Sequence, residues 1–287
     1  GEARSLTIAC GKWLRICQRL DARHELRSGV ASPMSQCALH LHAEIAMRRF
    51  ILFLALLSAG QFAQAADYVR EQRWADEILP AILDGDPLWL EQTNGHKFLG
   101  LYIDPTQPRG AVILVHGMGV HPDWGINGVL RNRLAEHGYA TLSIQMPVES
   151  ASAVPGDYVA AFPEASERIE KAVTWLQNKG YARIGLVSHS LGGRMARAYL
   201  LANKTTPVKG WAALSMGFDD FEGVALPVLD IYTEQDHPPV LSMVDARKRT
   251  LKHPASTQHL LPATGHFYDG QEAEATRLVW EWLDKTL

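Results

Sequence analysis

The sequence is poor in cysteine: its three cysteines, Cys10, Cys17 and Cys37, all precede residue 38 of 287. Residues 38–287 can therefore form no disulfide bond among themselves and no cysteine-ligated metal site. Positive charge is not concentrated either, because no run of Lys and Arg exceeds three residues and the formal net charge is −3. This balance gives no reason to expect a nucleic-acid partner or a polybasic membrane anchor.

Long hydrophobic runs and nucleotide-binding motifs are also missing. The longest apolar stretch, FILFLALLSAG at residues 50–60, is short, whereas a membrane-spanning helix needs about 20 apolar residues. No G-x-G-x-x-G follows a predicted strand, which argues against a dinucleotide enzyme. No H-E-x-x-H pair occurs, so a helical zinc site is not expected. We therefore expect neither a cofactor nor a metal.

Residues 47–65 have the three parts of a secretory signal peptide. Met-Arg-Arg supplies a positive start, the apolar run follows, and Ala-Gln-Ala at 63–65 forms a small-x-small cleavage site. We predict a signal peptide at 47–65 and a periplasmic or secreted mature protein at 66–287, with no membrane span after cleavage. Residues 1–46 are then a spurious or disordered extension ahead of a true start at Met47.

Strand and helix signals alternate along 66–287. Apolar segments predict strands at 111–117, 139–146, 182–188, 208–216, 226–233 and 257–263. Residues 163–180 are the clearest helix, with Pro163 in the first turn and Gly180 at the end, and a further helix is expected at 240–251. Asn94-Gly95 between two apolar runs predicts a hairpin. The pattern predicts one α/β domain, a mostly parallel sheet with helices on both faces.

The segment SHSLG at 188–192 is typical of a nucleophile on a sharp strand-to-helix turn. Such a turn needs small residues two before and two after the nucleophile, and Ser188 and Gly192 meet this requirement. It would expose the Ser190 hydroxyl at a helix N-terminus. The alternative is that Ser190 is only an N-cap, a role that serine performs well.

HGMG at 116–119 follows another predicted strand and suits an oxyanion hole. The backbone amides of Met118 and Leu191 are the expected donors. The residues expected to line the pocket are His116, Gly117, Gly119, His121, Trp124 and His189. A metal site at His116, His121 and Asp123 is the weaker alternative for this loop.

Asp236 and His266 follow the last two predicted strands. They complete the chain order Ser, Asp, His that nucleophilic catalysis on an α/β-hydrolase sheet requires. Asp219 and Asp220 are rivals for the acid, and His237 is a rival for the base.

Together these motifs, which include HGMGVHPDW, LVSHSLGG and PVLDIYTEQDHP, resemble the α/β-hydrolase fold over nearly all of 88–287. More narrowly, they are similar to a family of uncharacterised bacterial exported proteins. The resemblance implies Ser190 as nucleophile, His266 as base and Asp236 as its orienting acid. Two residues depart from the common pattern: Ser188 stands where glycine is usual, and Thr233 stands where glycine often precedes the acid loop.

The sequence thus predicts an exported serine hydrolase that acts on a small-molecule ester or acyl substrate. The irregular segment 146–162 is the expected flap, and the short connection between the strands at 208–216 and 226–233 leaves no room for a large lid domain. An acyltransferase with the same triad, or a non-catalytic binding or envelope-assembly protein, remains the alternative. The sequence does not predict the oligomeric state.

Overall fold

The computed structural model describes residues 66–287. Its strands are β1 Asp86–Glu91, β2 Lys97–Ile103, β3 Gly110–Val115, β4 Tyr139–Ile144, β5 Ile184–His189, β6 Val208–Leu214, β7 Val228–Gln235 and β8 Thr257–Gly265. Its α-helices are α3 Tyr68–Ile78, α4 Ile126–Glu136, α5 Phe162–Asn178, α6 Leu191–Ala202, α7 Pro238–Leu241, α8 Val244–Thr250 and α9 Glu272–Thr286. Two 3₁₀ turns, η1 Leu79–Ala81 and η2 Asp157–Ala161, follow α3 and precede α5.

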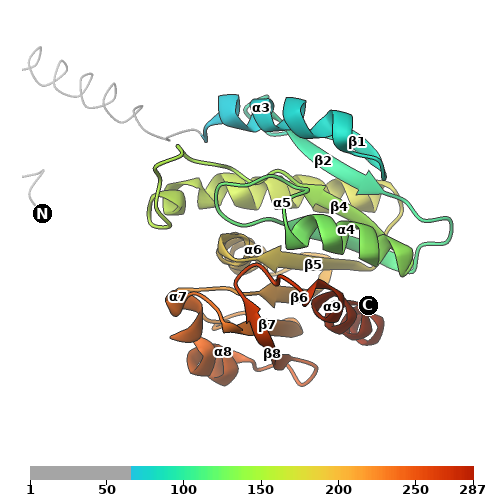
Figure 1. Cartoon of the computed structure of the whole chain (residues 1–287). Helices are drawn as coiled ribbons and strands as arrows, with labels where there is room; N and C mark the ends of the chain where they lie inside the picture. The colour runs from blue at the N-terminus through green and yellow to red at the C-terminus, as the bar shows by residue number, and fades with distance from the viewer. Residues whose placement is uncertain (1–65) are drawn as a thin grey trace, which may run out of the picture. The chain divides into compact units, whose positions relative to one another are not determined.

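The eight strands form one sheet in the order β1-β2-β4-β3-β5-β6-β7-β8, which runs from the blue end of the molecule to the red end in Figure 1. β2 pairs antiparallel with β1 and β4, and the pairs from β4 to β8 are all parallel. The predicted hairpin is confirmed, with Gly95 at φ 84° in the turn. This positive φ explains the glycine, since other residues rarely adopt it.

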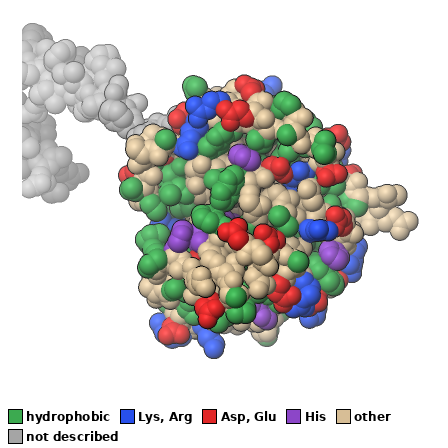
Figure 2. Space-filling model, in the orientation of Figure 1, with side chains coloured by type: hydrophobic (Ala, Val, Ile, Leu, Met, Phe, Trp, Pro, Cys, Tyr) green, Lys and Arg blue, Asp and Glu red, His purple; other side chains and the backbone are tan. Residues whose placement is uncertain are grey.

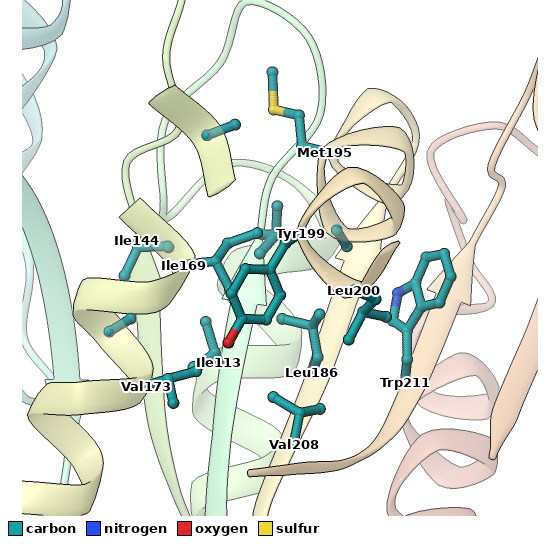
Figure 3. Close-up of a cluster of buried hydrophobic side chains, with 14 of the residues drawn as sticks. Ile113, Ile144, Ile169, Val173, Leu186, Met195, Tyr199, Leu200, Val208 and Trp211 are labelled. Carbon is teal, nitrogen blue, oxygen red and sulfur yellow. The ribbon is translucent and has the colours of Figure 1, made fainter. Parts of the chain in front are cut away.

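The central strands are mostly apolar because both faces of the sheet are covered. Every residue of β3 and β5 is buried. Helices α5 and α6 pack on one face and α4 and α9 on the other, which forms two separate clusters of apolar side chains. In Figure 3, Ile169 and Val173 from α5 and Tyr199 and Leu200 from α6 gather over Leu186 of β5.

Helix α5 shows how the sequence specifies these layers. Pro163 lies at its start, where its missing amide hydrogen costs nothing. Ile169, Ala172, Val173 and Leu176 recur at helical spacing and are fully buried. The helix begins and ends within two residues of the predicted boundaries, and the burial of this stripe is the reason.

The mostly parallel sheet, with helices on both faces, is confirmed, and the described residues contain no large lid domain. The helix expected near 240–251 is confirmed as α8, but it begins only at Val244, and α7 is a separate helix before it, with Ser242 and Met243 between the two. The expected flap at 146–162 is irregular except for η2 and the start of α5. Figure 2 shows acidic and basic side chains mixed over the face drawn.

The predicted signal peptide at 47–65 and the extension at 1–46 lie outside the described residues. Among residues 66–287, no helix combines the length and the apolar character that a membrane crossing needs.

Candidate active site

Ser190 occupies a sharp turn between β5 and α6. Its backbone has φ 55° and ψ −125°, a conformation that is costly for a residue with a side chain. The turn is tight because Gly192 lies against β3: a Cβ added at Gly192 would lie 2.6 Å from the carbonyl oxygen of Val115. Strain of this kind persists only where the surrounding structure imposes it. The N-cap alternative is not supported, because the Ser190 side chain caps no amide of α6.

Ser188 has its own reason to replace glycine. Its Oγ accepts a hydrogen bond of 2.8 Å from Trp211 Nε1, and both side chains are buried. A buried indole N–H without an acceptor is costly, so the serine satisfies a donor that a glycine would leave unpaired. The serine at position 188 is therefore explained by its hydrogen bond between β5 and β6.

Ser190, His266 and Asp236 form one chain of hydrogen bonds, although they lie far apart in the sequence. Ser190 Oγ lies 2.8 Å from His266 Nε2, and His266 Nδ1 lies 2.6 Å from Asp236 Oδ1. Both His266 and Asp236 are buried, whereas Ser190 is partly exposed. The three residues follow β5, β7 and β8, whose parallel pairing brings their carboxyl ends to the same edge of the sheet. Such a chain can take the proton from a serine hydroxyl while it attacks a carbonyl.

Asp236 is held as a carboxylate. Burial raises its pKa, but hydrogen bonds from His266 and Ser215 and the charge of His266 outweigh it and lower the pKa to about 2. Ser215 Oγ donates to Asp236 Oδ2 at 2.5 Å. The backbone amides of Thr233 and His237 donate at 3.1 and 2.9 Å. All lone pairs that face the protein are therefore used, and the carboxylate cannot rotate away from His266.

Sequence reasoning missed Ser215 and Tyr268. The Tyr268 hydroxyl lies 2.9 Å from Ser215 Oγ and donates to the carbonyl of Ile231 at 3.2 Å. Ser215 has φ 52° and lies directly after β6. Its position at the end of a strand could have indicated a site residue, since Ser190, Asp236 and His266 share that position. The sequence around Tyr268 contains no comparable signal.

The two expected oxyanion donors border the same pocket as Ser190. The Leu191 amide lies in the first turn of α6, where helix amides have no intrahelical acceptor. Gly117 packs against the turn at Ser190: a Cβ on it would lie 3.2 Å from Ser190 Cβ. Met118 follows Gly117 and lines the same pocket as Ser190.

Of the residues expected to line the pocket, Gly117, Trp124 and His189 lie in its lining, whereas His116, Gly119 and His121 lie outside it. His116 is buried below the loop, where Nδ1 donates to the Gly117 carbonyl at 2.8 Å and Nε2 accepts from the Met146 amide at 2.8 Å. Burial lowers the pKa of His116 to about 3, so both bonds belong to the neutral ring. This histidine fixes the loop to the end of β4.

The remaining two residues belong to neighbouring structure. The positive φ of Gly119 turns the chain toward Arg70 of α3, whose Nη2 donates to the Gly119 carbonyl at 3.4 Å. The His121 ring packs edge-on against Trp74 of the same helix. Both therefore face α3 and not the pocket.

The metal alternative for this loop is not supported. Asp123 accepts two hydrogen bonds from Arg131, at 3.0 and 2.8 Å, and both ring nitrogens of His116 are engaged. Within residues 66–287, no three His, Cys, Asp or Glu side chains are grouped so that they could hold a metal ion.

The rival acids form ion pairs with two arginines of α6 and do not bond to His266. Asp219 pairs with Arg194 at 2.7 Å, and Asp220 pairs with Arg197 at 3.5 Å. The rival base, His237, stacks on His266 instead, with ring centroids 3.9 Å apart and planes 14° apart.

His189 contacts His266 through a hydrogen bond to its backbone. Its Nε2 donates to the His266 carbonyl at 2.9 Å. Burial, followed by the charge of His266, lowers the pKa of His189 to about 4, so the ring is neutral near neutral pH. The neutral His189 ring therefore adds no positive charge to the site.

Ser190 and His266 open into a pocket of about 430 Å³. Its walls come mainly from the ends of the central strands, α6, α7 and the loop after β6. Pro155 from the expected flap also reaches the lining. Trp124 and Phe267 meet edge to face at its rim, with centroids 5.2 Å apart.

Several solved structures share this architecture. An alpha-beta serine hydrolase homologue from Coxiella burnetii is 14% identical with a TM-score of 0.57, and the match covers 70% of this chain and 98% of the other. A dienelactone hydrolase from Anabaena variabilis is 20% identical with a TM-score of 0.58, covering 70% and 97%. The chain has the α/β-hydrolase fold. A cold-adapted esterase from an Arctic intertidal metagenomic library shares the fold, at 18% identity and a TM-score of 0.61, covering 70% and 93%.

The sequence also matches a family described as "Protein of unknown function (DUF3530)" over residues 48–167. This segment of the α/β-hydrolase-fold chain includes the HGMG loop and ends before Ser190. No curated protein matches the sequence.

Proposed function

We propose that this α/β-hydrolase-fold protein is a serine hydrolase that cleaves small carboxylic esters through an acyl-enzyme on Ser190. The observation that carries the proposal is the unbroken hydrogen-bond chain from Ser190 Oγ through His266 to Asp236, built on a strained turn. The proteins of similar fold that are described as a serine hydrolase homologue, a dienelactone hydrolase and an esterase agree with this chemistry.

In the proposed mechanism, Ser190 Oγ attacks the ester carbonyl while its proton passes to His266 Nε2. The Asp236 carboxylate stabilises the resulting imidazolium through Nδ1–H. The backbone amides of Met118 and Leu191 bind the oxyanion. His266 then donates the proton to the leaving alcohol, and the acyl group stays on Ser190. Water then attacks the acyl-enzyme while His266 removes its proton. His266 returns this proton to Ser190 Oγ as the acid is released, which restores the free serine and the neutral base.

The pocket supports small to medium substrates. A volume of about 430 Å³, with no lid domain over it among residues 66–287, suits short acyl chains better than long ones. A preference for long-chain over short-chain p-nitrophenyl esters would contradict this part of the proposal.

The first test is labelling with a fluorophosphonate probe, together with turnover of p-nitrophenyl acetate and butyrate. Ser190→Ala should lose both signals, because the probe reacts only with an activated serine. Ser242→Ala, which changes an exposed serine near the pocket, is the matched control and should retain both. A folded wild-type protein that neither labels nor turns over ester would favour the non-catalytic binding protein instead.

The same triad would serve an acyltransferase if an alcohol replaced water. Turnover of p-nitrophenyl butyrate with and without added short alcohols distinguishes the two. A hydrolase forms mainly butyrate, whereas a transferase forms mainly the new ester.

We further propose that the protein is exported to the periplasm or secreted. The support is the sequence of residues 47–65 alone, with its positive start, apolar run and Ala-Gln-Ala site. N-terminal sequencing of the native protein should begin at Ala66. A mature chain that retains Cys10 would contradict the proposal.

A further inference from the structure

One side chain of the pocket lining carries a permanent charge, unlike the others. The walls are mostly apolar, with Trp124, Phe218, Val240 and Phe267 among them. Three histidines also line the pocket, but Arg194 is the one lining residue in 66–287 with a permanent charge. A permanent charge on a mostly apolar wall is a natural place for a charged group of a ligand to bind.

The Arg194 guanidinium is held in place but is not saturated. Nε donates to Asp219 Oδ2 at 2.7 Å. The rings of Phe162 and Phe218 lie 5.2 and 5.4 Å from its central carbon. A guanidinium has five N–H groups, and four of them are on Nη1 and Nη2. Within residues 66–287, no protein acceptor is bonded to either Nη atom of Arg194.

The position of Arg194 relates it to the nucleophile. It lies four residues after Ser190, about one helical turn or 6 Å along α6. Helix side chains lean toward the N-terminus, which brings Arg194 toward the turn that carries Ser190. The side chain is 15% exposed, and Arg194 lines the same pocket as Ser190.

We propose that Arg194 binds a carboxylate on the substrate, so that the preferred substrates are short esters that carry an acid group. This inference rests on the proposed ester hydrolysis at Ser190. The planar fork of Nη1 and Nη2 matches the two oxygens of a carboxylate, and an apolar wall strengthens the charge-assisted bonds. Asp219 lies outside the lining, so the substrate meets the cation and not its partner.

The competing explanation is that the Arg194–Asp219 pair only holds the loop after β6 against α6. Arg197 offers a matched control for this explanation. It lies one turn further along α6, pairs with Asp220 and donates to the Asp220 carbonyl at 2.6 Å, but it does not line the pocket.

The test compares monoethyl glutarate with ethyl pentanoate, which have the same chain length but differ in one carboxylate. The measured quantity is the ratio of their kcat/KM values. The wild-type ratio should be above one, and Arg194→Gln should lower it by at least about tenfold, the effect of losing a charge-assisted hydrogen bond. Arg197→Gln should leave the ratio unchanged. The inference would be overturned if wild-type protein preferred ethyl pentanoate, or if Arg194→Gln had the same kcat/KM ratio as wild type.

A binding measurement separates this inference from the proposed reaction. Monoethyl glutarate is titrated by calorimetry into Ser190→Ala, with and without Arg194→Gln. Binding that weakens at least about tenfold in the double variant supports the carboxylate site, even if wild-type protein fails to label with fluorophosphonate. Labelled Ser190 with no binding of monoethyl glutarate would leave the hydrolase standing and reject the role of Arg194.

Discussion

Replacing Ser215 by alanine tests how strongly the protein holds the Asp236 carboxylate. Ser215 Oγ donates to Asp236 Oδ2 at 2.5 Å, and both groups are buried. A hydrogen bond to a charged group contributes about 1.5–3 kcal/mol. We expect Ser215→Ala to lose about 2 kcal/mol of unfolding free energy near neutral pH. For a domain of this size that loss lowers Tm by roughly 4–8 °C.

The pH dependence of this loss identifies its cause. The folded pKa of Asp236, about 2, lies below its ordinary value of 3.8. The carboxylate therefore adds stability above 3.8, and this contribution is lost as the pH falls through the folded pKa. About half of it should be gone at about pH 3. Removing the Ser215 donor raises the folded pKa, so the difference between variant and wild type should shrink as the pH falls from 7 to 3.

Urea unfolding across this pH range measures the effect, and Ser143→Ala is its matched control. Ser143 is also buried, but its Oγ donates at 2.6 Å to the neutral carbonyl of Pro122. Its loss should be smaller, about 1 kcal/mol, and should not vary with pH. A Ser215→Ala loss that is independent of pH, or no larger than that of Ser143→Ala, would refute the reasoning.

Three further predictions concern the turn and its surroundings. Gly192→Ala should destabilise the protein by at least about 3 kcal/mol in urea unfolding, because overpacking against the Val115 carbonyl cannot be relieved by a side-chain shift; wild-type stability would contradict this close approach. Ser188→Ala should cost about 1–3 kcal/mol, and the cost should largely vanish in a Trp211→Phe background, where no indole N–H is left unpaired; equal losses in both backgrounds would exclude the hydrogen bond as the cause. His237→Ala should lower ester kcat/KM by about fivefold, since it removes the ring stacked on the base, and His237→Phe should recover most of it; no recovery would point away from stacking.

The candidate site was predictable from the sequence where its residues depend on local chain geometry. Ser190 could be singled out because a tight turn between a strand and a helix requires small neighbours, and those neighbours are adjacent in the chain. Asp236 and His266 could be chosen because the carboxyl ends of parallel strands meet at one edge of a sheet. The fold followed from the same strand and helix alternation.

The roles of Ser188, His116 and Arg194 could not be predicted in this way. Ser188 accepts a hydrogen bond from Trp211 on the next strand, and His116 accepts one from the amide of Met146. The proposed role of Arg194 depends on an apolar pocket that several loops build together. The sequence alone determined the order of the elements and the turn that carries Ser190, because periodicity and turn chemistry are local. Only the tertiary structure decided which buried polar groups are paired and which face the pocket, since those partners are set by packing between strands and loops that are remote in the chain.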